Sequence, residues 1–200
     1  MELSALTAIS PLDGRYGSKT QELRPIFSEY GLMRFRVQVE LTWLKHLAAC
    51  EQIKEVPPFS AKTIEFIDSI INNFSEEDAL DIKKREAVTN HDVKAVEYFL
   101  KDKTASNEEI AKVREFIHFA CTSEDINNNS HALMLKEARE EVLLPVIDEI
   151  IEKITDHTYT LRDKYGNITN ERVIDEIDLC GDSQLRKEIK EIIEKYVPRL

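Results

Sequence analysis

The segment TSEDINNNSHALMLKEAREEVLLPVIDEIIEKITDHTYTLR, residues 122–162, predicts a long helix and with it the fold class. The hydroxyl residues Thr122 and Ser123 stand before two acids, a pattern typical of a helix start. A hydroxyl can cap free N–H groups there, and acids favour the positive end of the helix dipole. Side chains of one face then recur at helical spacing, namely Ile126, Ser130, Leu133, Ala138, Val142, Ile150, Ile154 and Leu161. Pro145 is expected to kink or break this helix near Leu144.

The sequence before residue 122 predicts shorter helices separated by breaks. Residues 1–28 hold prolines and glycines without a helical period, which indicates an ordered arm or loop. A helical pattern over residues 29–53 should stop at Pro57, because proline cannot continue a helix. The caps expected for the following helices are Ser60, Ser75 and Asn107. No segment keeps a period of two, so we expect an all-α fold built as a bundle of long helices.

Composition excludes several classes of protein. The formal net charge of −11 argues against a general nucleic-acid binder and against docking on an anionic membrane. No apolar run approaches the roughly 20 residues of a membrane span, and the N-terminus lacks the features of a secretory signal. The cysteines Cys50, Cys121 and Cys180 form no metal-ligand spacing and no disulfide framework. We therefore expect a cytoplasmic protein without a metal or a cofactor.

Two polar clusters lie at breaks in the helical pattern of the N-terminal half. In residues 10–16, the guanidinium of Arg15 suits a phosphate or a carboxylate, although a solvated arginine on a surface loop explains it as well. In residues 89–92, Asn90 can cap a helix and His91 can titrate or donate a hydrogen bond to an anion. The alternative here is an ordinary cap with a bystander histidine. Taken alone, each cluster favours the structural interpretation.

A third cluster, residues 118–125, directly precedes the long helix. Its two hydroxyls and the free N–H groups of a helix start can together bind an anion. An ordinary N-cap explains Ser123 but leaves Thr122 and His118 unexplained, so both interpretations stay open. Cys121 lies within the cluster, yet a buried small residue is a better interpretation than a nucleophile, since no base and orienting carboxylate are fixed beside it.

Together the clusters resemble a known family. The segments LSALTAISPLDGRY (3–16), TNHDVKAVEY (89–98) and EFIHFACTSEDINN (115–128) are similar to the bacterial adenylosuccinate lyases of the fumarase/aspartase superfamily. The resemblance extends from residue 1 to about residue 162. It implies the helical fold of that superfamily and a homotetramer whose active sites are each shared by three subunits. It also implies elimination of fumarate from succinyl-AMP, and from the succinyl-carboxamide ribotide, in purine biosynthesis.

The resemblance gives each cluster a role in substrate binding. It implies no metal and no cofactor. The residues concerned are Arg15 and Tyr16 on the phosphate side, Asn90, His91 and Asp92 in a second binding cluster, Thr122 and Ser123 at a succinyl carboxylate, and His118 near the substrate. It also implies a division into an N-terminal domain (1–120), the start of a central bundle (121–164) and a helical tail (165–200) that resembles the family's C-terminal domain.

The residues that carry out the chemistry in this family lie in segments that the sequence lacks. One reads Ser-Arg-Thr-His-Gly-Gln-Pro-Ala and holds the proposed general acid, and a later mobile loop holds the proposed serine base. We therefore expect no catalytic residue here and no activity of the chain alone. Part of a larger chain, a truncated product and a natural fusion all remain open, the first being preferred. The alternative functions are a non-catalytic interaction module on a lyase scaffold and, more weakly, a regulatory helix bundle.

Overall fold

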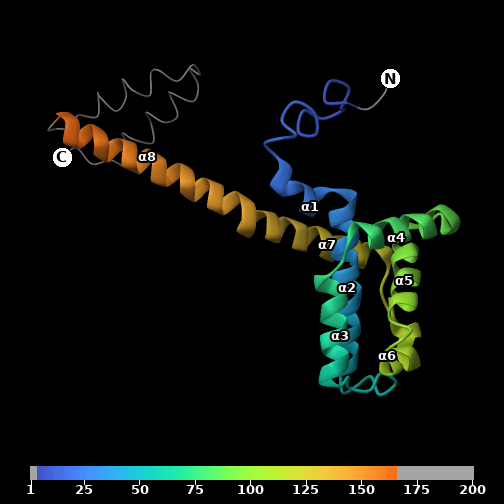
Figure 1. The fold of residues 1–200 in the computed structure, drawn as a ribbon. Helices are drawn as coiled ribbons and strands as arrows, with labels where there is room; N and C mark the ends of the chain where they lie inside the picture. The colour runs from blue at the N-terminus through green and yellow to red at the C-terminus, as the bar shows by residue number, and fades with distance from the viewer. Residues whose placement is uncertain (1–3, 166–200) are drawn as a thin grey trace. The chain divides into compact units, whose positions relative to one another are not determined.

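The computed structural model describes residues 4–165, with side chains up to residue 154, and every regular element in this range is helical. The all-α prediction is therefore confirmed. The helices are α1 (Arg24–Phe27), α2 (Glu29–Ala49), α3 (Ala61–Asn72), α4 (Glu76–Thr89), α5 (Asp92–Lys103), α6 (Glu108–Val113), α7 (Ser123–Glu137) and α8 (Leu144–Tyr165) (Figure 1). The chain forms two compact units, residues 1–143 and 144–200. None of the helices within 4–165 has the length and apolar character that crossing a membrane requires.

Helix α2 is the centre of the first unit. It contacts α1, α3, α4, α5 and α7, and Figure 1 shows α3 beside it. Its apolar stripe of Val37, Leu41 and Leu44 is fully buried, and it packs on a core that includes Ile67, Ile82, Leu100 and Ile110. Each such side chain stabilises the fold by roughly 1.5–3 kcal/mol through removal from water. The polar residues on the same helix are therefore held in a rigid frame.

The predicted caps are confirmed. Ser60 caps α3 by accepting the N–H of Thr63, and Asn107 caps α6. Ser75 and Asp78 form a capping box at α4, in which each side chain accepts the backbone N–H of the other residue. These caps set where the helices of the core begin.

Two of the predicted boundaries in the N-terminal half are wrong. The helix expected over 29–53 ends at Ala49, well before Pro57, because the chain must turn back to bury Val56 against Leu47 and Ala48. Residues 21–27, expected to be an arm or loop, form a short 3-10 helix and α1. A proline stands at the start of α1, a position that proline favours, and Ile26 is buried next to it.

The long helix changes its hydrogen-bond pattern near Pro145. Helix α7 ends at Glu137, residues 138–143 form a π-helical segment, and α8 begins at Leu144. A break near Leu144 was predicted, because proline lacks the N–H that an α-helical turn needs. The structure adds that the interruption extends over six residues of π-helix. Predictions for the tail, which include Cys180, lie outside the described residues, and the division at 120 and 164 stays a prediction.

Acidification should weaken the start of α4. The carboxylate of Asp78 is largely buried, which opposes its charge, but hydrogen bonds from Lys103 (2.6 Å) and Ser75 outweigh burial and lower the pKa of Asp78. A lowered folded pKa gives stability that is present above the unfolded value of about 3.9 and is lost as pH falls below it. Urea denaturation at pH 6 and pH 3 should therefore show a smaller loss on acidification for Asp78→Asn than for the wild type. Glu77→Gln, which removes a neighbouring acid without these hydrogen bonds, should respond like the wild type; equal responses of all three proteins would contradict the assignment.

Candidate functional site

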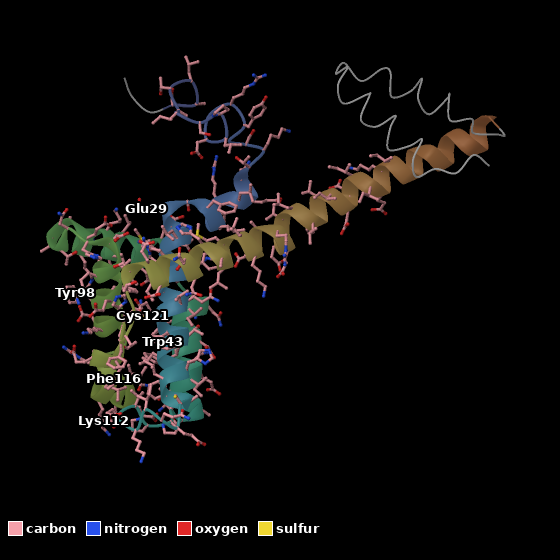
Figure 2. The ribbon with its side chains drawn as sticks, turned by 180° about the vertical axis from the view of Figure 1, so that it is seen from behind. Glu29, Trp43, Tyr98, Lys112, Phe116 and Cys121 are labelled. Carbon is pink, nitrogen blue, oxygen red and sulfur yellow. The ribbon has the colours of Figure 1, made fainter. Side chains whose placement is uncertain are left out.

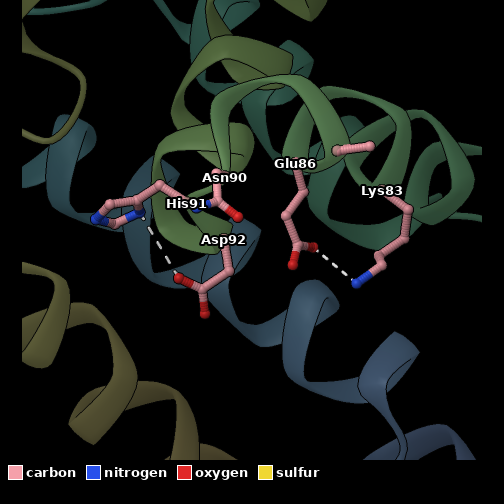
Figure 3. A pocket seen from close by; sticks show the side chains of 6 residues that line it. Lys83, Glu86, Asn90, His91 and Asp92 are labelled. Atoms are coloured by element: carbon pink, nitrogen blue, oxygen red, sulfur yellow. Dashed lines mark ion pairs between the residues drawn. The ribbon is translucent and has the colours of Figure 1, made fainter.

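The turn between α4 and α5 carries the second polar cluster. Asn90 ends α4 in a left-handed conformation (φ 53°), which asparagine tolerates better than most residues. His91 caps α5, with its Nδ1 accepting the N–H of Lys94 at 3.2 Å. Asn90, His91 and Asp92 border a hollow of about 500 Å³, which Lys83, Glu86 and Ala87 complete (Figure 3). The turn therefore brings the three predicted side chains to one concave surface.

The charges around this hollow are mixed. Lys83 pairs with Glu29 (2.6 Å) and Glu86 (2.8 Å), and the hydrogen bond to Glu29 contributes most to raising the pKa of the lysine. Figure 3 marks the approach of His91 Nδ1 to Asp92 at 3.7 Å, but this nitrogen already accepts a backbone N–H and has no proton to donate. Lys83 is thus paired with the two carboxylates of Glu29 and Glu86. An anionic ligand would therefore need further hydrogen-bond donors from outside the hollow.

A buried arginine joins this cluster to the start of α7. Arg36 on α2 is 6% exposed. Its Nη2 donates to Asp92 Oδ2 at 2.6 Å and its Nε donates to Asn127 Oδ1 at 3.0 Å. Burial opposes the charge of Asp92, but the N–H of Val93 and the guanidinium outweigh it and lower the pKa of Asp92. Arg36 therefore fixes the start of α5 relative to the first turns of α7.

The third cluster lies at the start of α7, where the capping residue is Thr122 and not Ser123. The Thr122 hydroxyl accepts the N–H of Asp125 (3.4 Å) and donates to Asp125 Oδ2 (2.8 Å), while the backbone N–H of Thr122 donates to the same oxygen at 2.7 Å. We expected Ser123 to be the capping residue and Thr122 to have no role in the cap; this expectation is wrong. The acid three residues after Thr122 decides which hydroxyl closes the capping box. Within the described residues the Ser123 hydroxyl has no hydrogen-bond partner, so it is the one available to a ligand.

His118 and its neighbours are held by α2. The Nδ1 atom of His118 lies 2.6 Å from Oε1 of Glu40, whose residue is completely buried. Trp43 Nε1 donates to the carbonyl of Phe119 at 2.8 Å, and Figure 2 labels Trp43 on α2 and Cys121 at the end of this segment. Helix α2 therefore supplies one contact to the side chain and one to the backbone of the segment that leads into α7.

Cys121 has no feature of an activated nucleophile. Burial and the nearby negative charges of Glu40 and Asp125 raise the pKa of its thiol, which disfavours the thiolate. This agrees with the sequence-based preference for a structural cysteine.

The first cluster, with Arg15 and Tyr16, makes no polar contact with the other two clusters among the described residues. The Arg15 guanidinium lies over the Tyr16 ring at 5.1 Å, and both side chains are exposed. Between residues 4 and 165, no hydrogen bond or ion pair joins either residue to the other two clusters. The structure thus connects the second and third clusters through Arg36 and leaves Arg15 and Tyr16 on the N-terminal arm.

The sequence interpretation missed two residues that organise the site, Arg36 and Glu40. They stand four residues apart on α2, among positions that are otherwise apolar and buried. Charged side chains are almost never fully buried unless they are paired. An i, i+4 pair of opposite charges on a core-facing stripe was therefore a signal available in the sequence.

Comparisons with known proteins give one consistent result. A family model described as "Lyase" matches residues 14–164. The chain is 63% identical to adenylosuccinate lyase of Escherichia coli (strain K12) over 163 residues, which are 82% of this chain and 36% of the relative. It is 65% identical to adenylosuccinate lyase of Vibrio cholerae over 154 residues, 77% of this chain and 34% of the relative. The chain thus spans about a third of the length of these relatives.

Proposed function

The chain belongs to the lyase family, and from that membership we propose that it is the substrate-binding N-terminal part of an adenylosuccinate lyase. The observation that carries the proposal is the family match over residues 14–164, which contains every candidate site residue. Identities of 63% and 65% to adenylosuccinate lyases support this particular member of the family. We infer that the complete protein releases fumarate from succinyl-AMP and from the succinyl-carboxamide ribotide.

The start of α7 suits the binding of a carboxylate. In the proposed reaction a base removes a proton next to a carboxylate, the bond from carbon to the purine nitrogen breaks, and an acid returns a proton to that nitrogen. The intermediate places negative charge on the carboxylate, which fixed donors stabilise. The free Ser123 hydroxyl and the N–H groups of the first turn are such donors. In this proposal Arg15 and Tyr16 hold the phosphate, and Asn90, His91 and Asp92 contribute the second set of contacts.

The complete protein is proposed to act as a homotetramer in the cytoplasm. Helix α8 supports assembly, because Leu144, Val146, Ile147 and Ile150 are each 45–51% exposed at helical spacing. An apolar stripe of this kind marks a helix that packs against another surface. The net charge of −11 and the spacing of the cysteines support the location.

The 200-residue chain alone should be inactive and should gain activity from the missing segments. The test mixes it with a polypeptide that holds the remaining residues of the Escherichia coli relative, and follows cleavage of succinyl-AMP by absorbance. We expect cleavage in the mixture and in neither part alone. Ser123→Ala should reduce the rate of the mixture roughly tenfold or more, the value of a hydrogen bond to a charged group.

The matched control is Ser106→Ala, an exposed serine between α5 and α6 that lies outside the clusters; it should leave the rate unchanged. Cleavage by the chain alone would contradict the missing acid and base. A mixture that assembles but neither cleaves nor binds succinyl-AMP would favour the non-catalytic interaction module instead.

A further inference from the structure

The carboxyl of Glu40 is placed at a high energetic cost. It is completely buried on α2, and its Oε2 has no hydrogen-bond partner among the described residues. Its Oε1 has one partner, His118 Nδ1 at 2.6 Å. An ionised carboxylate in such a place is costly unless a donor satisfies it. An apolar residue would fill the position at lower cost, so the carboxyl calls for a reason beyond packing.

Among the residues with described side chains, the groups around Glu40 leave the imidazole as its only donor. Arg36 is one turn away on the same helix but is committed to Asp92 and Asn127. Glu97 on α5 adds negative charge near Glu40, and its own partners are Lys94 and Lys101. Burial raises the pKa of the Glu40 carboxyl, and the hydrogen bond from His118 counteracts this. Burial outweighs this hydrogen bond, so the pKa of Glu40 stays above its ordinary value and the imidazole remains the one polar contact of its Oε1 among the described residues.

The segment that carries His118 is strained. His118 and Ala120 have φ values of 66° and 57°, in the left-handed region that costs non-glycine residues about 1–2 kcal/mol each. The Glu40 and Trp43 contacts hold this conformation. Nε2 of His118 makes no hydrogen bond within residues 4–165, and 21% of the side-chain surface is exposed. Hydrogen bonds from Thr122 are the main cause that lowers the pKa of Asp125 in the first turn of α7, and His118 contributes to the same shift, so the imidazole lies near that turn.

We propose that Glu40 is a positioning residue: its buried carboxylate accepts the Nδ1 proton of His118 and thereby directs Nε2 toward the start of α7. Through His118 it holds the strained segment that leads into α7, where the Ser123 hydroxyl binds a carboxylate of a dicarboxylate substrate. This rests on the proposed function. The hydrogen bond that one ring nitrogen makes determines the state of the other.

The test uses the 200-residue chain labelled with ¹⁵N at histidine. The ¹⁵N shifts of the neutral His118 ring should show the proton on Nδ1 in the wild type. Glu40→Leu fills a similar volume without an acceptor, so the proton should move to Nε2. Glu40→Gln keeps an acceptor oxygen and should restore the wild-type pattern at least in part. A packing role alone would be satisfied by leucine, so the two variants separate packing from positioning.

The second readout is titration with succinate, followed at the Ser123 amide. Glu40→Leu should weaken binding about tenfold, because the strained segment that leads into α7 loses the hydrogen bond that holds it, and Glu40→Gln should recover part of the loss. Asp68→Asn is the matched control, because it removes a carboxylate paired with another α2 side chain, Lys45, and touches neither Glu40 nor His118; it should change neither readout.

Two outcomes would overturn the proposal. The first is a proton on Nε2 in the wild type, or ¹⁵N shifts that stay unchanged in Glu40→Leu. Either result would show that Glu40 does not position the His118 ring. The other is succinate binding that ignores Glu40, or no succinate binding at all, which denies the carboxylate contact. Failure of the proposed function would appear separately, as the absence of succinyl-AMP cleavage in the reconstituted mixture. Circular dichroism confirms that each variant is folded.

Discussion

Asp92→Asn is expected to lower the free energy of unfolding by about 3 kcal/mol, the cost of leaving a buried charge without its partner. The group left behind is the guanidinium of Arg36, whose side chain is 7% exposed and cannot regain water. Arg36→Met should cost less, because it leaves the carboxylate of Asp92, which is 46% exposed and stays hydrated. Urea denaturation at pH 7, followed by circular dichroism, measures both values.

The matched control is Asp68→Asn. Asp68 is 45% exposed, like Asp92, and pairs with Lys45 at the same 2.6 Å, but Lys45 is 28% exposed. Its loss should cost about 1 kcal/mol or less, as is usual for surface pairs. Equal losses for Asp92→Asn and Asp68→Asn would show that the burial of Arg36 has no energetic consequence. The double variant of Arg36→Met with Asp92→Asn should be less unstable than the sum of the single changes.

Gly31→Ala is expected to lower the free energy of unfolding by about 2 kcal/mol or more, as overpacking does in a tight site. Gly31 lies in the first turn of α2, where an added Cβ would lie 2.2 Å from the carbonyl oxygen of Ile26 and 2.8 Å from that of Pro25. Both are backbone atoms, so no side chain can move away to relieve the contact. Thermal and urea denaturation should show the loss.

The direction of the stability change in Gly31→Ala distinguishes overpacking from helix propensity. Replacing glycine by alanine inside a helix usually stabilises by about 1 kcal/mol. Ala132→Gly, at an exposed position of α7, measures that propensity in this protein and should cost about 1 kcal/mol. A stabilised Gly31→Ala protein would mean that α1 can move away from α2 without cost.

Local rules were enough to predict the caps. Ser60, Ser75 and Asn107 each bind an N–H two or three residues ahead, so the sequence contains everything that the contact needs. The end of α2 was not predictable in this way. It is decided by the burial of Val56 beside Val113, and no pattern around residue 49 indicates that contact.

The candidate site likewise contains contacts that local sequence predicts and contacts that it does not predict. The break at residues 89–92 was predicted and is confirmed, but the cap expected from Asn90 is made by His91, and Asn90 ends α4 instead. The choice between Thr122 and Ser123 could have been made from the spacing to Asp125. The partners of Arg36 could not, since Asp92 and Asn127 are 56 and 91 residues away in the sequence. Only the tertiary fold brings a guanidinium to both.

The hydrogen bonds from α2 to the segment before α7 also have a consequence for synthesis. They close loops of 78 and 76 residues, from Glu40 to His118 and from Trp43 to Phe119. Helix α2 leaves the ribosome long before its partners do, and chain entropy opposes the closure of such long loops. Helices that are neighbours in sequence, such as α4 and α5, can pair earlier. The serine at the start of α7 is therefore put in place late, and nascent chains pass through a stage in which the helices exist but this end of the site does not.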